Sequence, residues 1–118
     1  QVEAEDEDTL ENGEQVFRVV EVMPKFPGGD AELLKFIAKN VKYPQESQDK
    51  GEQGRVICSF VVTKDGTLTN YKVLRGISPA LDQEAVRVLQ VMPRWTPGTQ
   101  RGEPVAVKYT VPITFKLQ

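Results

Sequence analysis

The stretch VAVKYTVPITF, residues 105–115, decides how this chain folds. Apolar side chains stand at every second position of it: Val105, Val107, Tyr109, Val111, Ile113 and Phe115. This period of two is typical of a β-strand with one buried face. Pro112 interrupts the pattern, and because proline has no N–H to donate to a neighbouring strand, it is tolerated mainly on an edge strand.

The backbone of this stretch carries the same period as its side chains. In an extended chain the N–H and C=O groups of successive residues alternate between the two lateral directions. If Pro112 faces away from the sheet, the backbone groups of the other even-numbered residues do so too: Ala106, Lys108, Thr110, Thr114 and Lys116. The sequence therefore predicts an open sheet edge on this strand.

Length and charge divide the chain into a tail and one domain. The 118 residues are 39% hydrophobic, which suffices for one core and not comfortably for two. Seven of the seventeen acids and no base fall within residues 1–15, so this run repels itself and has no apolar period. We predict a disordered acidic linker over residues 1–15 and a domain over residues 16–118, whose bases outnumber its acids.

Two amphipathic helices are expected in the domain. The first is DAELLKFIAKNVKYP, with Asp30 as its N-cap and Pro44 as its stop. The second is SPALDQEAVRVLQVMP, with Ser78 as its N-cap and Pro79 at the first helical position. A short polar helix or turn, QESQDKG, follows the first helix.

The strands define the fold class. GRVICSFVV and LTNYKVLRG form a hairpin around the turn at Asp65 and Gly66. The first of them is almost continuously apolar and suits a central position, and a right-handed crossover places the last strand beside it. We expect an α+β two-layer sandwich: a three-stranded antiparallel or mixed sheet of order 2-1-3, two helices on one face, and a short N-terminal strand or extended segment.

The residues argue against catalysis and against nucleic-acid binding. The chain has no histidine and no phosphate-binding loop, so we expect no enzyme, no metal and no cofactor. Its bases are scattered without an aromatic–basic motif, so no nucleic-acid partner is expected. Cys58 lies in an apolar run and is expected to be buried, and Trp95 is expected to anchor the core.

Several separated motifs together resemble one family. These are MPKFPGG, FIAKNVKYP, GRVICSFVVTKDGTLTNYKVLRG, LDQEAVRVLQVMPRWTPG and GEPVAVKYTVPITF. In this order they resemble the C-terminal domain of TonB energy transducers, in the subgroup whose domains begin with an MPxFPGG motif. The resemblance covers residues 16–118.

The resemblance implies a function in transport. Such domains lie in the periplasm, tethered to the inner membrane and to the ExbB/ExbD motor complex by a part of the protein that precedes them. They bind the TonB box of outer-membrane transporters for siderophores, vitamin B12 or glycans. Binding occurs by β-strand addition beside the last strand and transmits force derived from the proton gradient.

The resemblance also implies contact residues. On the last strand they are Val105, Ala106, Val107, Lys108, Tyr109, Thr110 and Thr114, and in the VKYP motif they are Val41, Lys42 and Tyr43. Tyr43 fits a structural staple at the helix end equally well. The sequence leaves two alternatives open: a docking or sensor module of a membrane metallopeptidase or antirepressor, and a self-association module that forms a homodimer through its open edge.

Overall fold

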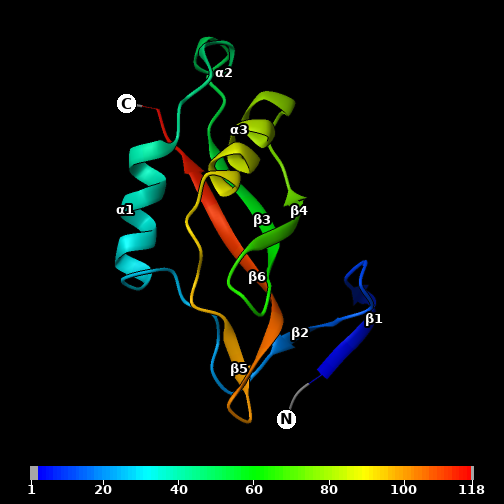
Figure 1. Ribbon diagram of the computed structural model, residues 1–118. Coiled ribbons are helices and arrows are strands. Elements are labelled where there is room, and N and C mark those ends of the chain that lie inside the picture. The colour runs from blue at the N-terminus through cyan, green and yellow to red at the C-terminus, as the bar shows by residue number, and fades with distance from the viewer. Residues whose placement is uncertain (1–2, 118) are drawn as a thin grey trace.

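The computed structural model describes residues 3–117, with side chains from residue 9 onward. The elements follow the chain in this order (Figure 1): β1 (Glu3–Thr9), β2 (Gln15–Val19), α1 (Asp30–Asn40), α2 (Gln45–Asp49), β3 (Gly54–Val62), β4 (Leu68–Arg75), α3 (Pro79–Gln90), β5 (Gly98–Gln100) and β6 (Glu103–Phe115). None of the helices in this part of the chain combines the length and the hydrophobicity that crossing a lipid bilayer requires.

The long strands lie in the predicted order. β3 is central, with β4 antiparallel on one side and β6 antiparallel on the other. The expected order 2-1-3 is therefore confirmed for these strands. The sheet is wider than predicted, since its full order is β1-β2-β6-β3-β4 and β5 pairs with the start of β6. β2 runs parallel to β6, so the sheet is mixed.

The core lies between α1, α3 and one face of the sheet. Leu33 of α1 and Leu81 of α3 belong to the same buried cluster as Phe60 of β3 and Ile113 of β6. Alternate residues on β3 and β6 point to the opposite face, where a smaller buried cluster contains Val61. We call this side the uncovered face, because the described helices contribute no residue to its cluster.

Trp95 anchors the core, as the sequence predicts. Only 3% of its surface is exposed, and its ring makes edge contacts with Phe26, Phe60 and Tyr109 at centroid distances of 5.7, 5.2 and 4.9 Å. Its backbone N–H donates to the carbonyl of Gly66 in the β3–β4 turn at 2.9 Å. A Cβ on Gly66 would lie 2.2 Å from the Trp95 carbonyl oxygen, so this close approach requires glycine.

The helix ends are partly as expected. Ser78 caps α3, since its Oγ accepts the N–H of Leu81 at 3.3 Å, and Pro79 is the first helical residue. The prediction that Asp30 caps α1 is wrong, because Gly29 is the N-cap and Asp30 is the first residue of the helix. There the negative charge of Asp30 interacts favourably with the helix dipole. α1 ends at Asn40, before the predicted stop.

Cys58 is fully buried, as expected. Burial, and then the charge of Asp82, raises the pKa of its thiol to about 11.

The N-terminal segment differs from the prediction of disorder. β1 pairs antiparallel with β2, and the turn between them is closed by N–H groups of Leu10 and Gly13, which donate to Glu14 and Leu10 at 2.8 Å. Backbone pairing needs no apolar periodicity, which was the signal behind that prediction. A domain boundary at residue 15 remains a prediction.

Candidate functional site: the outer edge of β6

The outer edge of β6 is paired over its first part only. β5 pairs with residues 103–105, and β2 pairs with Ala106 and Val107. From Tyr109 to the end of the strand, β3 is the only strand in the described part of the chain that pairs with β6. We call residues 109–115 the open edge. It is shorter than the sequence predicts, because the predicted edge begins at Ala106.

The register between β3 and β6 fixes which backbone groups face outward. Ile57 lies opposite Pro112, and since proline cannot donate, this pair cannot exchange two hydrogen bonds. Bonded and non-bonded pairs alternate along an antiparallel ladder, so Thr110 and Thr114 belong to the non-bonded class. Their N–H groups therefore point away from β3, as the position of Pro112 in the sequence predicts.

Side-chain burial along β6 alternates between the two faces of the sheet. Thr110, Pro112 and Thr114 are exposed, whereas Val111 and Phe115 are buried. The side chains of Val111 and Phe115 thus lie on the face that the helices cover, and those of Thr110, Pro112 and Thr114 lie on the uncovered face.

The first predicted contact residues are already occupied. Val16 lies opposite Ala106 and Phe17 lies opposite Val107, and both β6 residues have 0% exposure. Val105 lies opposite a residue of β5. The composition of QVFRVVEV predicts a strand but does not show that it pairs with β6. Two residue pairs between parallel strands leave no periodic pattern in the side chains.

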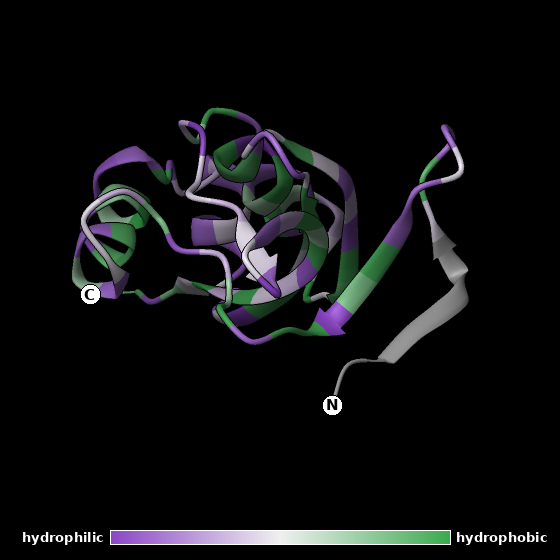
Figure 2. Ribbon diagram, turned by 60° about the horizontal axis from the view of Figure 1, so that its bottom comes forward, coloured by the Kyte–Doolittle hydropathy of each residue, from purple (hydrophilic) through white to green (hydrophobic). Residues whose placement is uncertain are grey.

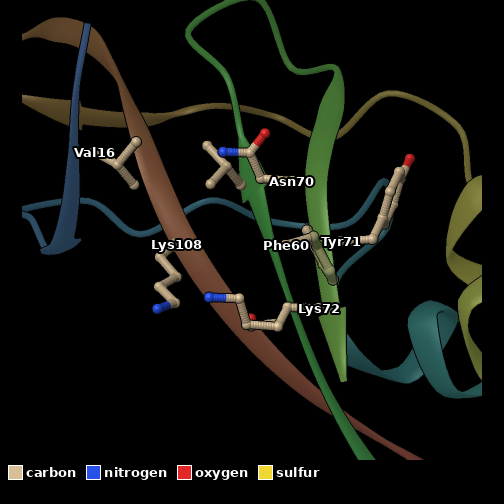
Figure 3. Close-up of a pocket in the computed structure, with 8 residues that line it drawn as sticks. Val16, Phe60, Asn70, Tyr71, Lys72 and Lys108 are labelled. Atoms are coloured by element: carbon tan, nitrogen blue, oxygen red, sulfur yellow. The ribbon is translucent and has the colours of Figure 1, made fainter. Parts of the chain in front are cut away.

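Lys108 and Tyr109 lie on opposite faces of the sheet. Tyr109 packs on Trp95 among the core aromatic rings, and burial, followed by the charge of Asp30, raises the pKa of its hydroxyl. Lys108 lies on the uncovered face at a hollow of about 210 Å³ that Lys72 also lines. Figure 3 shows the ammonium end of Lys72 directed toward Lys108 across this hollow.

The VKYP segment is fixed at the far end of β6. The N–H of Lys42 donates to Glu84 Oε2 at 2.6 Å, and Arg87 Nη2 donates to the carbonyl of Asn40 at 2.7 Å. Burial acts to raise the pKa of Glu84, but hydrogen bonds from Arg87 and Lys42 lower it below its usual value. Val41 is extended and half-buried, and its N–H closes the end of α1.

Tyr43 serves as a structural staple. Its hydroxyl donates to the carbonyl of Glu52, and its ring meets the edge of Phe115 at a centroid distance of 5.6 Å. The structure therefore brings Tyr43 to one end of the open edge and Ala106 to the other. In the described residues, no group of histidine, cysteine and acidic side chains could hold a metal ion.

Residues of this chain that form the helices, the sheet and the strand edge match a known protein family. The family of Gram-negative bacterial TonB protein C-terminal domains matches residues 39–117. That match covers more than half of the chain. The chain therefore belongs to this family.

Known relatives agree. Over 76 residues the chain is 30% identical to Protein TonB of Pseudomonas aeruginosa, a match that covers 64% of this chain and 22% of that protein. The NMR structure of the Helicobacter pylori TonB C-terminal domain has the same fold, with a TM-score of 0.52, 23% identity, and coverage of 73% of this chain and 90% of that one. The chain thus spans about a fifth of the curated relative.

Proposed function

We propose that this domain binds the TonB box of outer-membrane transporters by β-strand addition to the open edge of β6. The observation that carries the proposal is the outward direction of the Thr110 and Thr114 N–H groups in an exposed stretch. An extended peptide is the ligand that satisfies such a row of backbone groups. Tyr43 lies against Phe115 at the end of this row, so the VKYP segment is a second contact for the bound peptide.

The energy of backbone pairing sets the expected affinity. Each hydrogen bond contributes about 0.5 to 1.5 kcal/mol net, and micromolar binding needs about 8 kcal/mol. The N–H and C=O groups of the open edge fall short of this value alone. Side-chain packing, or extension of the peptide toward Ala106, must therefore supplement them.

The family implies the cellular role. In this proposal the domain lies in the periplasm, is tethered to the inner membrane by a preceding part of the protein, and receives force from the ExbB/ExbD motor. The peptide's hydrogen bonds run perpendicular to the strands if it adds in the antiparallel direction. A pull along the strand loads them together, which suits a grip that transmits force in transport and then releases.

Two substitutions at one residue test the proposal. Thr110→Pro removes the outward N–H and leaves the inner ladder intact, whereas Thr110→Ala keeps this donor. We expect Thr110→Pro to melt cooperatively but to lose binding in titration calorimetry to synthetic peptides that carry the TonB boxes of the source organism's transporters. Thr110→Ala should bind within a few-fold of the parent. Normal binding by a folded Thr110→Pro would exclude addition at this edge.

A further inference from the structure

The segment that precedes the core is held by a short ladder. We call residues 10–19 the N-terminal arm. Within the arm, β2 pairs with β6 through two residue pairs, Val16 with Ala106 and Phe17 with Val107. By contrast, every residue of β3 pairs with β6. Figure 2 shows β2 and the turn before it standing away from the body of the fold.

One apolar side chain of the turn adds to this ladder. Leu10 is half-buried on the uncovered face, where it packs against the cluster formed by Val16, Val61 and Ala106. The larger core contains none of these residues. The arm can therefore leave the sheet without opening the core beneath the helices.

An ion pair joins the arm to the turn between β3 and β4. Glu14 forms an ion pair with Lys64 at 3.7 Å, and the side chain of Lys64 is 65% exposed. Lys72 and Lys108 line a hollow of about 210 Å³ on the uncovered face, while β3 and β4 contain no acid. The arm itself carries two acids, Glu11 and Glu14, and one base, Arg18. Exposed ion pairs of this kind are weak and are screened by salt.

We propose that the N-terminal arm is a displaceable cover of the β6 edge, which occupies Ala106 and Val107 in the free domain and gives way when a partner strand adds. The alternation that directs Thr110 outward also directs Ala106 and Lys108 toward β2. Removal of the arm thus extends the open edge by the residues that the ladder now covers. The part of this inference that concerns the partner strand rests on the proposed function.

A reversible lock tests the displacement in the intact chain. Val16 and Ala106 are partners on adjacent strands, which lie about 4.7 to 4.9 Å apart, within the range that a disulfide spans. We expect the double variant Val16→Cys/Ala106→Cys, oxidised in dilute solution, to bind the TonB-box peptides about tenfold or more weakly than the same protein after reduction. The unmodified chain under the same conditions is the control, since its single thiol, Cys58, is buried.

Two outcomes of this experiment would overturn the inference. Equal affinity of the oxidised and reduced forms would show that the peptide binds without moving the arm. A disulfide that joins two chains, seen as a dimer on a non-reducing gel, would show that a second copy supplies the strand at this edge.

Hydrogen exchange tests the arm without any peptide. The amide of Phe17 should exchange about a hundredfold or more faster than that of Cys58, because the arm opens locally, and added salt should accelerate Phe17 alone. Equal and salt-independent protection would overturn the inference. If the reduced variant binds none of the peptides, the proposed function fails, and the exchange result still decides whether the arm detaches.

Discussion

β3 and β6 lie side by side but differ in what surrounds them. β3 is paired on both sides, and Val56 and all residues from Cys58 to Val62 are buried. β6 shares the core with β3 on its inner side, yet the pairing of its outer side with β2 and β5 does not extend along the open edge. The fold thus places its stability in β3 and the aromatic rings above it and leaves an edge of β6 unpaired. In the proposed function this separation lets the edge change partners without loss of the core.

The largest predicted effect tests the β3 side of this comparison. Trp95→Ala should lower the free energy of unfolding by about 3 to 5 kcal/mol, because the ring is buried against Phe26, Phe60 and Tyr109. Urea denaturation followed by circular dichroism measures this value. An almost unchanged stability would mean that the aromatic cluster does not carry the fold.

A smaller effect concerns the turn that joins β3 to β4. Hydrogen bonds from the hydroxyls of Thr63 and Thr67, and from the N–H of Thr67, lower the pKa of Asp65 to about 2 from its usual 3.8. A carboxyl pKa that is lower in the folded protein than in the unfolded chain stabilises the fold at pH values above the usual pKa. This stabilisation is lost as the pH falls from about 4 through 2. Asp65→Asn should therefore melt below the parent at neutral pH, and the difference should shrink over that window. Melting curves that stay equally far apart at pH 7 and pH 2 would contradict this assignment.

The smallest effect concerns the N-terminal end. Deletion of residues 1–15 removes Leu10 and Glu14 but no residue of the core beneath the helices. The melting temperature should change by no more than a few degrees in differential scanning calorimetry. A larger drop would show that β6 depends on the preceding segment for stability, and would erase the contrast between the two strands.

The sequence predicted the parts of the fold that have a periodic or terminal signal. The alternation of residues 105–115 gave the edge strand, and the apolar run of residues 54–62 gave the central one. The Ser78–Pro79 signal gave the start of α3. These elements are determined by local pattern, so they could be identified without tertiary information.

The sequence could not predict what depends on contacts between distant segments. The pairing of β2 with Ala106 and Val107 depends on backbone groups and leaves no pattern in the side chains. The position of Tyr43 against Phe115 depends on how the chain packs after α1. The open edge therefore lies on the strand that the sequence indicated, but β5 and β2 pair with three of the residues predicted as contacts, Val105, Ala106 and Val107.

The direction of the Thr110 N–H is the central claim, and amide hydrogen exchange measured by NMR tests it most directly. In the free domain Thr110 should exchange rapidly, while its neighbours Tyr109 and Val111, whose N–H groups face β3, exchange slowly. A saturating TonB-box peptide should then slow the exchange of Thr110 by about tenfold or more and leave its neighbours unchanged. Slow exchange of Thr110 in the free domain, or no added protection when the peptide is bound, would contradict the account.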